Sequence, residues 1–405
     1  MAQRTTTICC SAAALIASSA FALAKGDRTL LSFFPTRAVW SLALNNQLLQ
    51  PPAYDGLRGY FAIAGDRLVA YDLGSGTRQW IVDAAVTSAP AAGGDSIFFV
   101  QGDMLTALSG ADGSVAWKTT AADMLAVPAT WHGGWLLLAT TNGSITAIRS
   151  SDGHVIWRRD LGSPAHAQPA IFADRVYVPV SDHRVVALNV ETGEPMWERR
   201  LGGAPNEILA VDAQLFVGST DNFLYCLKAS DGTVDWRWRS GADVRGLPVA
   251  DEQRVYFVSL DNVLRALNRS NGVQQWIQML RLRPTSGPVR AGGTIVVGGL
   301  QPPLRAFNSK DGASAGDIAA PGELAAPPHL LIDPEGDQPL LVIVTRDIAK
   351  GATVTLIGRS NDPAAAAFTT LPTAIPTVPA LQQPPQAQYG SPAIERTASS
   401  TRRAR

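Results

Sequence analysis

Side chains that could bind a metal or act as a nucleophile are few and scattered in this sequence. The five histidines contain no pair at the spacing of metal ligands: His132, His154, His166, His183 and His329. Of the three cysteines, Cys9 and Cys10 are adjacent near the start of the chain, and Cys226 stands alone. The glycines recur with predicted hairpins and do not indicate a phosphate-binding loop. The sequence therefore predicts no catalytic constellation and no metal site.

The net charge and the composition limit which classes of molecule the protein is expected to bind. The chain of 405 residues has 34 Lys and Arg against 34 Asp and Glu, which gives a formal net charge of +0. This balance argues against nucleic acid or a polybasic membrane contact as the main partner. The hydrophobic fraction of 46% is sufficient for a packed core over most of the chain.

Tryptophan is the residue whose spacing is most regular. Successive members of the series lie 40, 37, 40, 40, 39 and 40 residues apart: Trp40, Trp80, Trp117, Trp157, Trp197, Trp236 and Trp276. A tryptophan can stack on a ligand, but a period of this length indicates a structural repeat. We therefore interpret these seven residues as structural.

Two further positions recur with the tryptophans. A glycine stands four residues before each of the last six: Gly76, Gly113, Gly153, Gly193, Gly232 and Gly272. A small residue occupies a fixed place in the strand before that turn: Ala70, Ala107, Ala147, Ala187, Cys226, Ala266 and Ala306. Each unit predicts a four-stranded antiparallel sheet, in which the small residue leaves room between sheets and the tryptophan fills it.

Counting these units gives eight blades. Six end at Trp80 through Trp276, and residues 287–320 form a seventh with Gly316 at the tryptophan position. An eighth, residues 324–360, lacks an outer strand, whereas Trp40 has no hairpin before it. We expect residues 38–44 to supply that strand, because a closed ring leaves no end blade exposed. The sequence thus predicts an all-β, eight-bladed β-propeller over residues 37–360, closed by an N-terminal strand that joins the last blade.

The two ends of the chain differ in composition from the repeats. Residues 1–24 are typical of a signal peptide and predict an exported protein of the periplasm or cell envelope. Two alternatives remain for this segment, an uncleaved membrane anchor and lipid attachment at Cys9 or Cys10. A lipidated cysteine should follow an apolar stretch and a small residue, whereas here Ile8 precedes Cys9 and the apolar run comes after it. Residues 361–405 are rich in Pro and Ala, which predicts a disordered tail.

The unit at residues 185–197, VVALNVETGEPMW, resembles the PQQ-like repeat. The resemblance extends over residues 38–320 and is weaker over 324–360. It implies the propeller fold and two possible functions. One branch of the family contains quinoprotein dehydrogenases, and another contains BamB, the propeller lipoprotein that scaffolds outer-membrane β-barrel assembly.

The dehydrogenase branch implies pyrroloquinoline quinone stacked between a Trp and an adjacent-cysteine disulfide, a calcium ion and a catalytic Asp. The only adjacent cysteines, Cys9 and Cys10, fall in the signal segment, and the blades contain no long insertions. Aspartates such as Asp112 and Asp152 stand at hairpin turns, where they have a structural role. We therefore predict no quinone and no calcium, and keep the dehydrogenase as the alternative.

The BamB branch agrees with the length, signal and blade number of the chain, although the sequence has no lipobox. The resemblance implies a docking surface of loops with an apolar and arginine cluster near acidic residues. The nearest counterparts are Asp243 and Arg245, and the run Leu280, Arg281, Leu282 and Arg283. Arginine beside exposed leucine on a rigid rim suits an interface, whereas solvated loop charges are the plainer interpretation.

Together these features predict a non-catalytic, monomeric scaffold outside the cytoplasm that binds a protein or peptide, possibly a β-barrel assembly component. Association with a membrane would occur only through a partner or an uncleaved signal. A dehydrogenase dependent on pyrroloquinoline quinone and a propeller that senses a small ligand are the alternative functions.

Overall fold

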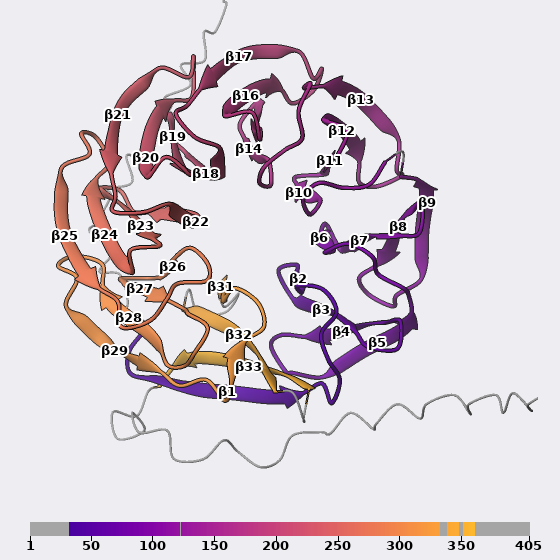
Figure 1. Ribbon diagram of the computed structural model, residues 1–405. Coiled ribbons are helices and arrows are strands. Elements are labelled where there is room, and N and C mark those ends of the chain that lie inside the picture. Colours follow the sequence, from indigo (N-terminus) through magenta and orange to yellow (C-terminus); the bar gives the residue numbers. More distant parts are fainter. Residues whose placement is uncertain (1–31, 122, 333–337, 348–350, 361–405) are drawn as a thin grey trace, which may run out of the picture.

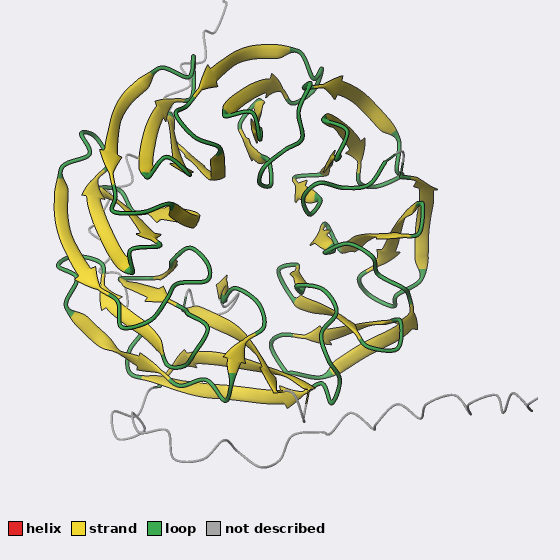
Figure 2. Ribbon diagram, in the orientation of Figure 1, coloured by secondary structure: helices red, strands yellow, loops and turns green. Residues whose placement is uncertain are grey.

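The computed structural model describes residues 32–121, 123–332, 338–347 and 351–360. The predicted signal peptide at residues 1–24 and the predicted tail at 361–405 lie outside the described residues. The described chain contains strands and loops but no helix, and its eight antiparallel sheets stand in a ring (Figures 1 and 2). This confirms the predicted eight-bladed β-propeller.

The first seven blades each have four strands, which follow one another in sequence from the innermost to the outermost. Blade 1 is β2 (Ala53–Tyr54), β3 (Arg58–Ile63), β4 (Arg67–Asp72) and β5 (Arg78–Asp83). Blade 2 is β6 (Ala91–Gly93), β7 (Ser96–Gln101), β8 (Met104–Ser109) and β9 (Val115–Thr120). Blade 3 is β10 (Thr130–His132), β11 (Trp135–Ala139), β12 (Ser144–Arg149) and β13 (Val155–Asp160). Blade 4 is β14 (Ala170–Phe172), β15 (Arg175–Pro179), β16 (Arg184–Asn189) and β17 (Pro195–Arg200).

Blades 5 to 7 follow the same order. Blade 5 is β18 (Pro205–Val211), β19 (Gln214–Ser219), β20 (Phe223–Lys228) and β21 (Val234–Arg239). Blade 6 is β22 (Val244–Ala250), β23 (Arg254–Ser259), β24 (Val263–Asn268) and β25 (Gln274–Met279). Blade 7 is β26 (Val289–Ala291), β27 (Thr294–Val297), β28 (Leu304–Asn308) and β29 (Ser314–Ile318).

Blade 8 joins the two ends of the propeller. Its strands are β30 (Glu323–Leu324), β31 (His329–Ile332), β32 (Pro339–Asp347), β33 (Gly351–Arg359) and β1 (Thr36–Ala43). Strand β1 pairs with β33 from Thr36↔Arg359 to Ala43↔Thr353. This pairing confirms the predicted closure by an N-terminal strand. The blade has five strands and not four, because two short strands, β30 and β31, share the inner edge of β32.

In every blade except the seventh, the repeat tryptophan packs on the hairpin of the next blade. In blade 4, for example, Trp197 lies directly opposite the small residue Ala187. Each indole nitrogen donates a hydrogen bond of 2.7–3.1 Å to a carbonyl of the following blade. The ring also covers the turn glycine: a Cβ on Gly193, at φ +68°, would lie 2.5 Å from the Trp157 ring. The spacing therefore recurs because one contact, between the tryptophan of one blade and the glycine of the next, repeats around the ring.

The join between blades 7 and 8 replaces this contact. Gly316 pairs with Ala306 in the place of a tryptophan. The ring of Phe34 occupies the space beside Gly316, and Phe33 is fully buried among residues of both blades. The outer and third strands of blade 8 come from opposite ends of the described propeller and are not joined by a hairpin. A tryptophan at position 316 would thus have no hairpin turn to pack on, and the two phenylalanines fill the space.

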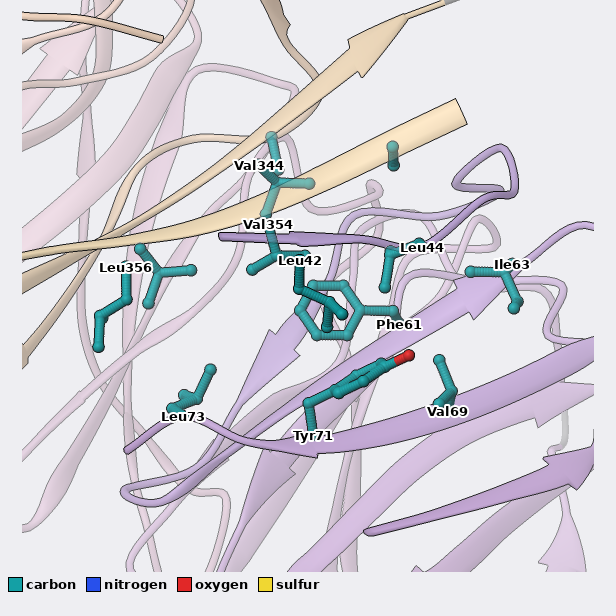
Figure 3. Close-up of a cluster of buried hydrophobic side chains, with 13 residues drawn as sticks. Leu42, Leu44, Phe61, Ile63, Val69, Tyr71, Leu73, Val344, Val354 and Leu356 are labelled. Carbon is teal, nitrogen blue, oxygen red and sulfur yellow. The ribbon is translucent and has the colours of Figure 1, made fainter. Parts of the chain in front are cut away.

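The closing strand also completes the core between blades 8 and 1. Leu42 and Leu44 are 2% and 1% exposed and pack with Phe61 of blade 1 and Val354 of blade 8 (Figure 3). Burial of apolar surface at such sites contributes about 20–33 cal/mol per Å² and is the main term that holds the ring closed.

The antiparallel strands divide the loops between two faces of the ring. On one face lie the hairpins between the two middle strands of each blade and the connections from each outer strand to the next blade. Isolated bridges such as Leu125↔Thr140 and Pro284↔Gly299 hold these two kinds of loop together. We call this the connector face. The glycine turns and the hairpins after the innermost strands form the opposite face, the turn face.

Candidate functional site

The predicted residues lie at the connector face of blade 6, Asp243 and Arg245 at its inner edge and Leu280 to Arg283 just after its outer strand. Asp243 ends the connection from β21 to β22, and Arg281 to Arg283 begin the connection from β25 to β26. The two segments touch through their backbones: a Cβ on Gly246, at φ +69°, would lie 2.0 Å from the nitrogen of Gly287. Only glycine permits this approach, because a side chain on either residue would collide with the neighbouring backbone.

The leucines of the predicted cluster are less exposed than expected. Leu280 is only 7% exposed and Leu282 is half-buried, and both pack into the core between blades 6 and 7. The expectation of an exposed leucine is therefore wrong for Leu280. The sequence contains the reason: Leu280 stands four residues after Trp276, as Leu161 and Leu201 do after their tryptophans, and all three are buried.

Two apolar side chains that sequence reasoning missed are exposed in their place. Leu247, beside Gly246, is 44% exposed, and Met279, the last residue of β25, is 69% exposed. The side chains of Arg245, Arg281 and Arg283 are exposed. We call the five residues Arg245, Leu247, Met279, Arg281 and Arg283 the rim surface. The sequence does contain a signal for Met279. The third residue after the repeat tryptophan is charged or carries a hydroxyl group in blades 1 to 5, but in blade 6 it is methionine.

A buried ion pair anchors the loop that leads into this surface. Asp261 accepts hydrogen bonds from the guanidinium and hydroxyl of Arg265 and Ser259, and from the backbone N–H of Gly241 at 3.0 Å. Burial acts against the charge of Asp261, but the bonds from Arg265 and Ser259 outweigh it and hold the pKa below its usual value. The carboxylate thus stays ionised and fixes the loop from β21 to β22.

The turn face has an aromatic hollow of about 700 Å³ where blades 8, 1, 2 and 3 meet. Tyr54 and His329 stack with ring centroids 4.2 Å apart, and Trp131 lies against Gly93. The buried hydroxyl of Tyr54 has no hydrogen-bond partner among the described residues. Burial lowers the pKa of His329 to about 4, so the imidazole is neutral at physiological pH. Chemically, this hollow suits a small planar group.

The cysteine and histidine side chains are dispersed in the structure as in the sequence. Over residues 32–121, 123–332, 338–347 and 351–360, no group of three His, Cys, Asp or Glu side chains could hold a metal ion. Cys226 is buried opposite Trp236, and burial raises the pKa of its thiol to about 12. That thiol is a core residue and a poor nucleophile. The adjacent pair Cys9 and Cys10 lies outside the described residues.

In the part of the chain that the structure describes, no helix is long and apolar enough to cross a membrane.

The repeats match a known family over most of their length. The sequence pattern of the family described as outer membrane protein assembly factor BamB matches residues 17–125, 105–214 and 199–323. The chain belongs to this family. Within the BamB family, a curated relative from Yersinia pestis is 32% identical over 97 residues. That match covers 23% of this chain and a quarter of the relative's length.

Solved structures show the same fold. BamB from Moraxella catarrhalis superposes with a TM-score of 0.64 at 22% identity, covering 81% of this chain and 98% of that protein. The quinohemoprotein alcohol dehydrogenase from Comamonas testosteroni reaches the same TM-score at 12% identity, covering 80% and 76% of the two chains. Because the same ring supports an assembly factor and a dehydrogenase, the fold alone does not decide between these functions.

Proposed function

We propose that this member of the BamB family is a non-catalytic scaffold outside the cytoplasm that binds a protein partner during the assembly of outer-membrane proteins. The rim surface is the observation that carries the proposal. Its three arginines form no ion pair with any described residue, and Arg245 and Arg281 each stand two residues along the chain from an exposed apolar side chain, Leu247 and Met279. Arginine with apolar anchors on fixed loops is the composition of protein interfaces.

The rigidity of the rim supports this function. Asp261 fixes one loop, and the contact between Gly246 and Gly287 fixes the second against it. A surface that is already ordered loses little conformational entropy when a partner binds. The net positive charge of the rim favours a partner segment that carries carboxylates, which would also speed the encounter.

The partner is tested by crosslinked capture from the native envelope, with direct detection of β-barrel assembly components. Arg281→Glu with Arg283→Glu should reduce recovery by about ten-fold, because like charges then face the acidic segment. The matched control is Arg200→Glu, an exposed arginine that ends the outer strand of blade 4. A wild-type protein that recovers no assembly component contradicts the proposal.

We further propose that the protein works without pyrroloquinoline quinone or calcium. Cys226 is buried in blade 5 and has no adjacent cysteine, so it does not fit the disulfide that the dehydrogenases use to stack the quinone. Purified protein incubated with quinone and calcium should not reduce an electron-accepting dye in the presence of alcohols. Reduction that depends on both additions would instead establish the dehydrogenase alternative.

Export is part of the same proposal. The mature protein should begin near Lys25 after removal of residues 1–24, and mass spectrometry of the N-terminus measures this directly. A mature chain that retains residues 1–24 would show that the protein is anchored.

A further inference from the structure

Each blade presents one unpaired backbone edge on the outside of the ring. The outer strands β1, β5, β9, β13, β17, β21, β25 and β29 each pair with a single strand, on their inner side (Figure 1). Such an edge has free N–H and C=O groups that can pair with a strand of another chain. Natural proteins prevent unwanted pairing mainly with charged side chains on these strands.

Blade 6 lacks this protection. Every other outer strand has at least one charged residue: Arg37 in β1, Arg78 and Asp83 in β5, Lys118 in β9, Arg158, Arg159 and Asp160 in β13, Glu198, Arg199 and Arg200 in β17, Asp235, Arg237 and Arg239 in β21, and Asp317 in β29. Strand β25, with the sequence QQWIQM, has none. It is therefore the outer edge most open to strand addition.

Two exposed side chains of β25 are apolar at positions that are charged in blades 4 and 5. The first and third residues after the tryptophan face solvent, and in blades 4 and 5 all four of these residues are charged. In blade 6 they are Ile277 and Met279, which are 44% and 69% exposed. The residue opposite Ile277 is Arg265, whose guanidinium is buried on Asp261 and so does not shield this face.

Two positive charges stand at one end of the same edge. Arg281 and Arg283 come two and four residues after the end of β25, are exposed, and form no ion pair with the described residues. A second copy of β25 would not neutralise them: laid antiparallel, it would bring residues 270–273, the run SNGV, to that end, and none of these has a carboxylate. The occupant that fits this edge is a strand with carboxylates at one end.

We propose that β25 captures an extended segment of a partner protein, one with alternating apolar side chains and with carboxylates where it passes Arg281 and Arg283. This inference rests on the proposed scaffold function and assigns it a site. Main-chain hydrogen bonds to the free edge would supply affinity, and contacts with Ile277 and Met279 would select apolar side chains at every second position.

A designed peptide tests the proposal directly. The probe is a labelled peptide about as long as β25, in which two aspartates precede an alternation of Thr with Val and Ile, so that antiparallel addition to β25 brings the aspartates to Arg281 and Arg283. Binding to the mature protein is measured by fluorescence anisotropy, and saturation with a Kd below about 1 mM is expected. Ile277→Lys with Met279→Lys should weaken binding by about ten-fold, because solvated charges replace the apolar contacts.

Controls separate strand addition from adhesion to an apolar patch. Thr120→Lys places the same charge on β9, at the position equivalent to Met279, and should leave peptide binding unchanged. Both variants should keep the wild-type melting temperature, since other blades already have charges at these positions. Peptides N-methylated at one set of alternate amides should lose binding, whereas methylation of the other set should not, because only one set faces β25.

The following results would overturn the role of β25, or distinguish it from the proposed function. No saturable binding, equal loss with Thr120→Lys, or equal binding of both methylated peptides overturns the proposal. A dimer of the free protein that Ile277→Lys with Met279→Lys abolishes also overturns it, because the edge would then pair two copies. A protein that recovers an assembly component yet does not bind the peptide refutes only the role of β25. A protein that binds the peptide yet recovers no such component supports the role of β25 and refutes the proposed function.

Discussion

Seven of the eight joins between blades are made in one way, and the join between blades 7 and 8 is made in another. At each regular join an indole covers a turn glycine and donates a hydrogen bond to the next blade, as Trp157 does to the carbonyl of Val190. At the exceptional join, Phe33 and Phe34 pack against Gly316 and its neighbours. A repeated contact can build a ring, but closing the ring requires residues from the other end of the chain.

Because the join between blades 7 and 8 is made differently, one short segment near the start of the described chain contributes to the ring in several places. Residues 33–44 fill the join between blades 7 and 8, supply the outer strand of blade 8, and through Trp40 make the regular contact with blade 1. No comparable stretch of a regular blade takes part in two joins and a closure. Substitutions in the two regions should therefore differ in cost.

The largest effect is expected from deleting residues 37–44. This removes the buried side chains of Leu42 and Leu44 and leaves β33 without its outer partner strand. The free energy of unfolding should fall by at least about 5 kcal/mol, since each buried leucine contributes about 2–5 kcal/mol. Thermal denaturation measures the loss. Deletion of residues 361–405, which the sequence predicts to be a tail, is the control, and equal effects of the two deletions would contradict the closure.

Phe33→Ala tests whether the exceptional join is as strong as a regular one. The side chain is 0% exposed, so its loss should cost about 3–5 kcal/mol, in the range expected for a large aromatic side chain in a core. Trp157→Ala, measured by the same chemical denaturation, gives the cost of a regular join. A much smaller cost for Phe33→Ala would mean that the other apolar side chains between blades 7 and 8, such as Ile318 and Ile343, hold this join without it.

Acid should weaken the junction of blades 8 and 1 through His329. Burial lowers its folded pKa to about 4 from 6.5, so the unfolded state binds the proton more tightly. Above pH 6.5 the protonation of His329 does not lower the free energy of unfolding. As the pH falls from 6.5 toward 4, this free energy decreases by up to about 3 kcal/mol. His329→Phe should flatten this part of the profile of melting temperature against pH. His154→Phe, at an exposed turn of blade 3, should leave the profile unchanged.

The smallest expected effect is the difference in cost between two glycine substitutions. It separates the contribution of backbone strain from that of packing at the regular joins. Gly162 and Gly193 have similar φ values, +73° and +68°, but only Gly193 lies against a tryptophan. Gly162→Ala should cost about 1–2 kcal/mol from the left-handed conformation alone. Gly193→Ala should cost about 1–3 kcal/mol more, because its Cβ would collide with the Trp157 ring. Equal costs, measured by denaturant unfolding, would show that the ring moves aside freely.

How far the sequence predicts the site depends on the residue. The exposure of Arg281 and Arg283 can be predicted from the sequence, because a connection between blades must run over the surface. Leu280 was misplaced because its neighbours in the sequence suggested a loop, whereas its distance from Trp276 makes it a repeat core position. Leu247 was missed because no local pattern sets it apart from the buried residues of its strand; its neighbour Gly246 contacts Gly287, which is far away in the sequence.

The sequence alone determined the number of blades, the place of each tryptophan and the strand that closes the ring. These follow from local rules, since each hairpin repeats the same turn and the same alternation of side chains, and an unpaired strand at each end leaves only one economical closure. Only the tertiary structure decided what each tryptophan contacts and why position 316 has none. It also showed which outer edge is unprotected, because that comparison requires knowing which side chains of the outer strands face solvent. Contacts between blades join residues more than thirty positions apart, and no local pattern specifies which surfaces meet there.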